Sequence, residues 1–194
     1  MTLDSRAATI PDRFGSRRAV ILAAALATLT FVAAAGVFAT VQTIWVDETT
    51  QLTGLALDWR ERLLWLLGRS DLDSGVPLDR MPPLGYVLGG LWAALFGLTE
   101  ISMRWFGIVA VAAAAPALFM AGRRAAGPLG GLFCLTFLLL SPNLISQSVA
   151  IRAYPLFFTF CAWGTWCFAL LVIDREPERP RGRATARRGG PCWR

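Results

Sequence analysis

The sequence predicts an all-α, multi-pass integral membrane protein with about four transmembrane helices and additional juxtamembrane helices in its first outer loop. Of the 194 residues, 55% are hydrophobic and only 16% are charged, and the mean hydropathy is +0.52. A soluble domain usually carries about 25% charged residues. The charges are also segregated, because five stretches contain no Asp, Glu, Lys or Arg: 19–46, 81–99, 105–122, 125–151 and 153–173. A helix needs about 20 apolar residues to cross a bilayer, so these stretches are the candidate spans.

The distribution of Arg decides how many of these stretches we expect to cross. Loops rich in Arg lie on the cytoplasmic side of a membrane. Segment 1–18, the Arg123–Arg124 pair and segment 174–194 are rich in Arg, whereas segment 47–80 carries seven acidic residues against four Arg. If stretch 83–98 does not cross, every basic segment lies inside and the acidic loop lies outside. We therefore predict a cell-membrane protein with a cytoplasmic segment 1–18, a membrane domain 19–173 with spans at about 19–41, 104–122, 126–146 and 153–173, an outer loop 47–100, and a basic, disordered cytoplasmic tail 174–194.

Two of the apolar stretches allow a second interpretation. Stretch 83–98 contains four Gly and follows a Pro-Pro pair, which suits the start of a helix. We expect an interfacial or re-entrant helix on the outer side there, with a fifth span as the alternative. The first stretch could be a signal peptide, but it is longer than the apolar core of about 7–15 residues that such peptides carry. We therefore expect an uncleaved anchor.

The outer loop is predicted to contain a helix over 49–67. Its apolar residues recur at the spacing of one helix face: Leu52, Leu55, Ala56, Trp59, Leu63, Leu66 and Leu67. Tryptophan favours the headgroup level of a bilayer, so we expect this helix to lie on the outer membrane surface. Segment 72–80 contains Gly, Pro and Asp and is predicted to be a loop.

The chain contains no His, and its four Cys form no Cys-x-x-Cys pair. This composition excludes the usual structural zinc site, a haem His ligand and a His general base. The net charge of +6 is at first sight compatible with nucleic-acid binding. The Arg residues instead flank the apolar stretches, as topology signals do, and we expect no nucleic-acid partner.

The candidate chemistry lies in charged residues that the predicted topology brings to the outer face. Asp47 and Glu48 follow the first span directly, and either could serve as a general base or bind a divalent cation. The alternative is that these acids only mark the end of a helix. Further candidates for binding the substrate or its phosphate are Asp79, Arg80, Arg104, Arg152 and Tyr154. For the Arg residues the alternative is that each reaches out to lipid headgroups.

The order of these motifs resembles the N-terminal part of the GT-C-fold membrane glycosyltransferases, specifically the protein O-mannosyltransferase and aminoarabinose transferase superfamily. The resemblance rests on DETTQ at 47–51, DRMPPLGY at 79–86, ISMRWFG at 101–107 and SQSVAIRAY at 146–154. It covers about residues 15–173. It implies that Asp47 is the catalytic base, that Glu48 lies in the same site, and that the stretch at 79–84 lies in the outer loop. Position 81 is Met where the family commonly has His.

The resemblance implies transfer of a sugar from a polyprenyl-phosphate donor to an acceptor on the non-cytoplasmic side. Asp47 would be the base, Glu48 its partner or an organiser of the site, and Arg104 and Arg152 the phosphate clamps. The implied partners are the lipid-linked sugar, membrane lipid and a further membrane chain completing the fold, because family members have about a dozen spans. Two alternatives stay open: a non-catalytic assembly subunit or small transporter, and an inactive transferase truncated near residue 174. A transporter would place charges near mid-membrane, which these stretches lack.

Overall fold

The computed structural model describes residues 17–68 and 82–173, and within these two ranges the protein contains helices joined by short connections and no strands. The helices are α1 (Arg17–Val41), α2 (Val46–Ala56), α3 (Trp59–Leu66), α4 (Pro83–Phe96), α5 (Glu100–Ala112), α6 (Ala115–Leu139), α7 (Pro142–Ser148) and α8 (Tyr154–Ile173). The all-α class predicted from the sequence is confirmed for this part of the chain. The predictions for segment 1–16, the loop at 72–80 and the tail at 174–194 concern residues outside the described ranges.

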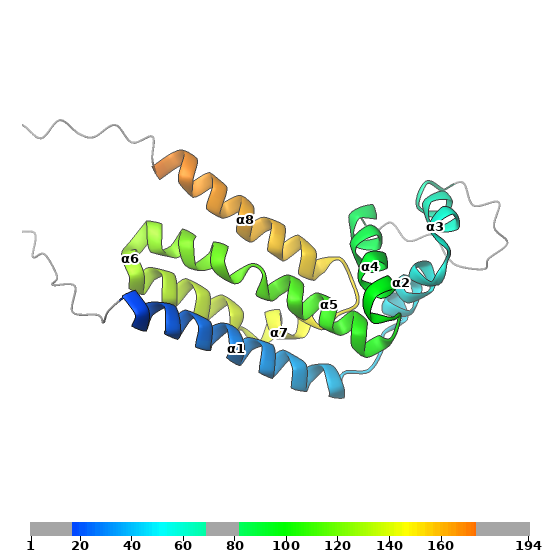
Figure 1. Ribbon diagram of the computed structural model, residues 1–194, viewed down its shortest axis with the longest axis horizontal. Coiled ribbons are helices and arrows are strands. Elements are labelled where there is room, and N and C mark those ends of the chain that lie inside the picture. The colour runs from blue at the N-terminus through cyan, green and yellow to red at the C-terminus, as the bar shows by residue number, and fades with distance from the viewer. Residues whose placement is uncertain (1–16, 69–81, 174–194) are drawn as a thin grey trace, which may run out of the picture.

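The long helices form an elongated bundle with a smaller group of helices at one end (Figure 1). Helices α5 and α6 form its centre, with α1 packed against one side and α8 against the other. Helices α2, α3 and α4 gather at one end of the bundle. The beginning of α1, the end of α8 and a reversal within α6 all lie at the opposite end.

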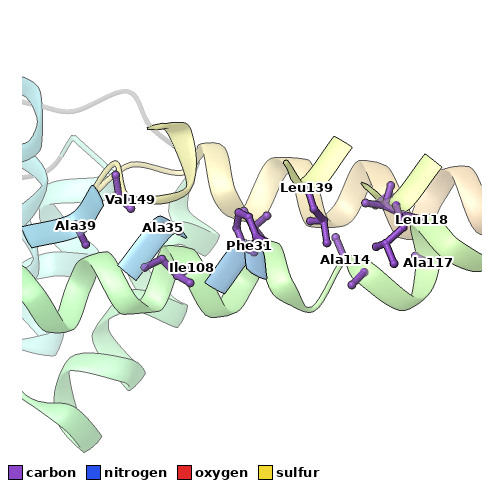
Figure 2. Packing of buried hydrophobic residues seen from close by; sticks show 13 residues of the cluster. Phe31, Ala35, Ala39, Ile108, Ala114, Ala117, Leu118, Leu139 and Val149 are labelled. Atoms are coloured by element: carbon purple, nitrogen blue, oxygen red, sulfur yellow. The ribbon is translucent and has the colours of Figure 1, made fainter. Parts of the chain in front are cut away.

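The core of the bundle combines a few large side chains with many small ones. Phe31, Ile108 and Leu139 are fully buried, and so are the alanines that separate them, including Ala35 and Ala117. Figure 2 shows these side chains meeting between α1, α5 and α6. Small residues let apolar helices approach closely, which is the usual packing mode of helices in lipid.

A second apolar cluster attaches the small helices to the bundle. Its buried members are Leu55, Trp65, Tyr86, Met103 and Ile151, drawn from α2, α3, α4, α5 and the segment before α8. The rings of Trp65 and Tyr86 meet edge to face with their centroids 5.1 Å apart, a favourable geometry for an aromatic pair. Helices α2 to α4 are therefore fixed to the end of the bundle by their own core.

Three helical stretches of the described residues are long and apolar enough to cross a membrane: Arg18–Val41, Glu100–Leu139 and Tyr154–Val172. These apolar helices indicate association with a membrane. Helix α4 is also apolar but has 14 residues. At 1.5 Å per residue its length is about 21 Å, less than the ~30 Å of a hydrocarbon core.

Helix α6 reverses its direction in the middle. Ala126 and Gly127 have non-helical backbone angles, and Gly127 has a φ of 74°, a left-handed value that suits glycine. The two halves of α6 touch on either side of the reversal. The contact is so close that a Cβ added at Gly122 would lie 2.6 Å from the carbonyl oxygen of Gly130. The long apolar stretch Glu100–Leu139 is therefore a hairpin and not one straight rod (Figure 1).

Three predicted helices are interrupted in the structure. The span predicted at 104–122 is divided between α5, which ends at Ala112, and α6, which begins at Ala115. The helix predicted at 49–67 is divided into α2 and α3 because the Asp58 carboxylate caps α3, accepting a hydrogen bond from the Glu61 N–H at 2.8 Å. The apolar stretch at 126–146 is also not one helix, since α6 ends at Leu139 and Ser141 has an extended backbone before Pro142. A residue before proline is disfavoured in the helical region.

Candidate functional site

A buried guanidinium, that of Arg104, connects three parts of the chain where α1, α5 and α7 end or begin. Its side chain is fully buried. Its Nε and Nη2 atoms donate to Glu100 Oε1 at 3.0 and 2.8 Å, its Nη1 donates to the Val149 carbonyl at 3.0 Å, and Nη2 also donates to the Gln42 carbonyl at 3.3 Å. Every nitrogen of Arg104 is therefore occupied by an acceptor within the protein.

The carboxylate of Glu48 lies beside this guanidinium and is equally enclosed. It is 3% exposed, and its Oε2 lies 3.7 Å from Arg104 Nη2. Oε1 accepts a hydrogen bond from the Ile151 N–H at 2.8 Å, and Oε2 accepts one from the Trp45 N–H at 3.1 Å. Glu48 therefore caps the first turn of α2 and, with its other oxygen, holds the segment that precedes α8.

A second acid–base pair lies at the surface next to this buried pair. Arg152 Nη1 is 3.5 Å from Asp47 Oδ2, and the side chains are 15% and 76% exposed. The guanidinium carbon of Arg152 also lies 6.0 Å from the ring centroid of Tyr154. Asp47 thus presents its carboxylate to solvent, while Arg152 presents one edge of a largely buried cation.

The surface pair lines a pocket of about 240 Å³. The pocket is lined by residues from the end of α1, the start of α2, α7 and the segment before α8: Gln42, Trp45, Asp47, Glu48, Ser146, Gln147, Ala150, Arg152 and Tyr154. Within the described part of the chain, Gln42 Oε1 and Arg152 Nε are buried and have no hydrogen-bond partner. The lining combines the Arg152 guanidinium, amides, a hydroxyl and a phenol, which suit an anionic, oxygen-rich ligand, with the carboxylates of Asp47 and Glu48, which do not.

The structure brings together four of the residues predicted from the sequence. Asp47, Glu48, Arg152 and Tyr154 line this one pocket. Arg104 lies behind the pocket wall and contacts Glu48. Asp79 and Arg80 lie outside the described residues.

The acids do not form a metal cluster in the described residues. No group of three or more His, Cys, Asp or Glu side chains suited to a metal ion occurs in residues 17–68 and 82–173. Both oxygens of Glu48 accept hydrogen bonds from backbone N–H groups, and Asp47 faces Arg152. The arrangement seen is one of ion pairs and capped backbone groups.

Sequence reasoning did not select Gln42, Gln147 or Glu100 as site residues. The signal for Glu100 was present, since an acid four residues before Arg104 on a helix lies next to it. Gln147 lies in the stretch 146–154 on which the resemblance partly rests. Gln42 carried no distinctive signal, because it accepts the Arg104 hydrogen bond through its backbone carbonyl, a group that every residue has.

A further buried guanidinium lies away from the pocket, in α3. Arg62 Nη2 donates to the carbonyls of Leu55 and Leu57, so it closes the C-terminal end of α2. Burial lowers the pKa of Arg62, and the negative charge of Asp58 acts in the opposite direction. The position of Arg62 between α2 and α4 gives it a structural role, and it does not line the pocket.

No protein family, no curated protein and no solved structure matches this chain. Its geometry and sequence pattern therefore carry any functional proposal.

Proposed function

We propose that this chain acts in a membrane glycosyltransferase, moving a sugar from a polyprenyl-phosphate donor to an acceptor hydroxyl or amine on the non-cytoplasmic side. The observation that supports this most is the pairing of the exposed Asp47 carboxylate with the largely buried Arg152 guanidinium, 3.5 Å apart, in a pocket at one end of a bundle of apolar helices. Transfer from a lipid-linked donor needs a base for the acceptor hydroxyl, a cation for the leaving phosphate and a scaffold embedded in the membrane.

In the proposed reaction Asp47 is the general base. Its carboxylate takes the proton of the acceptor hydroxyl, whose oxygen forms a bond to the anomeric carbon of the sugar. The bond between that carbon and the phosphate oxygen breaks, and the electron pair leaves with the polyprenyl phosphate. Arg152 and Tyr154 stabilise the charge on this leaving group. The donor phosphate would replace Asp47 as the counterion of Arg152, and the carboxylate would become free to act.

The membrane topology belongs to the same proposal. We propose four spans, with α1 and α8 as the first and last and the two arms of the Glu100–Leu139 hairpin between them, and with both termini in the cytoplasm. Supporting this, the start of α1, the end of α8 and the reversal near Arg123 and Arg124 share one end of the bundle. The pocket lies at the opposite end, which would face the non-cytoplasmic side.

Thiol labelling from either side of the membrane tests this topology. In a variant whose four native cysteines are replaced by alanine, we expect a membrane-impermeant maleimide to reach Ser70→Cys only from the non-cytoplasmic side. We expect Arg123→Cys to react only from the cytoplasmic side. Labelling of both positions from the same side would contradict the topology.

The activity is tested in proteoliposomes with labelled sugars on a polyprenyl phosphate and a hydroxyl-bearing acceptor. We expect Asp47→Asn to lower turnover by about 10²–10⁴-fold, the usual contribution of a general base. Glu61→Gln, which removes a carboxylate outside the pocket, is the matched control and should retain turnover. Near-normal turnover in Asp47→Asn would remove Asp47 as the base. Absence of transfer by the parent chain with every donor of this class would refute the proposal for the chain itself.

A further inference from the structure

We propose that Glu48 and Arg104 are positioning residues that set the separation between Asp47 and Arg152. This inference rests on the proposed function, because it assigns how that site is assembled. It also departs from the expectation that Arg104 binds phosphate, since Arg104 is fully buried and its nitrogens all face acceptors of the protein.

Glu48 links the two functional residues through their neighbours in the chain. It follows Asp47 directly, and its Oε1 accepts the N–H of Ile151, which precedes Arg152. This one bond, 2.8 Å long, joins residues 103 positions apart in the sequence. A change in the length or direction of the Glu48 side chain therefore changes the distance between the Asp47 carboxylate and the Arg152 guanidinium.

Arg104 fixes the same segment at its other end. Its Nη1 holds the Val149 carbonyl, so the non-helical segment 149–152 is held at Val149 by Arg104 and at Ile151 by Glu48. The segment also has a backbone bond of its own, from the Arg152 N–H to the Ala150 carbonyl at 2.9 Å. Glu100, which accepts two bonds from Arg104, keeps the guanidinium turned toward these acceptors.

The two oxygens of Glu48 make its carboxylate chemically necessary. Oε1 and Oε2 each accept from a backbone N–H, one of Ile151 and one of Trp45. A glutamine has one acceptor oxygen, and its NH₂ group can only donate. Glu48→Gln therefore leaves one of the two N–H groups facing another donor, although its volume is nearly unchanged.

The geometry is tested without reference to activity by cross-linking. In the variant without native cysteines, Asp47→Cys and Arg152→Cys are joined with a short bis-maleimide, and the rate of intramolecular cross-linking is measured. Adding Glu48→Gln should lower this rate by about tenfold or more, since a hydrogen bond to a charged group corresponds to at least that factor in population. Glu100→Ala, which removes both acceptor bonds to Arg104, should lower it less, because Glu100 is 42% exposed and acts through Arg104.

Leu139→Ala is the matched control, because Leu139 is fully buried in the bundle core and does not line the pocket. It should lower the melting temperature while leaving the cross-linking rate near that of the parent. An unchanged rate in Glu48→Gln, or an equal loss in Leu139→Ala, would overturn the positioning role. A Glu48→Gln chain that does not fold leaves Glu100→Ala as the deciding variant, because it removes both acceptor bonds to Arg104, and an unchanged rate there also overturns the positioning role.

Turnover separates this inference from the proposed function. In the parent background Glu48→Gln should lower kcat by about 10²-fold, as misplacement by about 1 Å does, with a smaller effect on KM. Loss of cross-linking with no turnover in any variant would support the positioning role and refute the glycosyl transfer. Full turnover in Glu48→Gln with loss in Asp47→Asn would refute the positioning role alone.

Discussion

Replacing Arg104 with Met tests whether the buried charge network holds the end of the bundle together. Methionine has a similar length and keeps most of the apolar packing, but it removes all of the guanidinium hydrogen bonds. The Val149 and Gln42 carbonyls then lose a donor, and Glu48, which is 3% exposed, loses its neighbouring cation. Glu100 is 42% exposed and can be rehydrated, so its contribution to the loss is small.

The expected cost follows from these partners. Breaking one side of a buried ion pair costs about 3–5 kcal/mol, because it leaves an uncompensated charge in the interior. For chains of 150–250 residues each kcal/mol corresponds to about 2–4 °C in Tm, so we expect Tm to fall by roughly 6–20 °C. Arg104→Lys should lose less, since it keeps the charge and three N–H donors, but its single nitrogen cannot reach all the acceptors that Arg104 contacts through three separate nitrogens.

Thermal unfolding of the purified protein in detergent measures this loss, with Arg60→Met as the control. Arg60 is exposed and should change Tm by little. The double variant Glu48→Gln/Arg104→Met should lose less than the sum of the two single variants, because the same contact is removed twice. A Tm of Arg104→Met within about 2 °C of the parent, or strict additivity in the double variant, would refute the reasoning.

Four further substitutions have definite expected outcomes. Gly107→Ala places a Cβ against the Ser148 carbonyl oxygen and should lower the free energy of unfolding by about 1–3 kcal/mol. The Cβ of Gly164→Ala meets nothing within 4 Å, so this variant should be neutral or more stable by about 0.5–1 kcal/mol. The Tm of each variant in detergent distinguishes the two outcomes. Gly127→Ala should cost about 1–3 kcal/mol in the same assay, because a φ of 74° strains any side-chain-bearing residue there even though the space is open. Asp58→Ala removes the cap of α3 and should cost about 1 kcal/mol, seen as faster proteolysis within 59–66 and not within α1.

The helical class and the approximate extents of the apolar helices could be predicted because they depend on composition and on the spacing of apolar residues. The predicted helix at 83–98 matches α4 closely, since a Pro-Pro pair begins it and Gly97 ends it. The division of 49–67 was missed because apolar periodicity continues across Asp58, although Asp58 followed three residues later by Glu61 is typical of a helix start.

The candidate site could be predicted only in part, for a different reason. Asp47, Glu48 and Arg152 were selected because charges beside apolar stretches are visible in a sequence, and Tyr154 was selected because it lies two residues after Arg152. The burial of Arg104 was not visible, because two of its acceptors are backbone carbonyls, of Val149 and Gln42, brought to it by tertiary packing. A backbone carbonyl has no residue-specific signal, so the separation of structural from solvent-facing Arg required the structure.

The long sequence separations in this network have a consequence for biogenesis. Arg104 and Glu48 are translated before Val149 and Ile151, their acceptor and donor 45 and 103 positions away. Until segment 149–151 has been synthesised, the nascent chain therefore carries a buried-site cation and acid that each lack one of their final partners. The arrival of segment 149–151 completes both bonds, so the insertion machinery and its proteases would encounter an incompletely paired charge network in any chain stalled before that point.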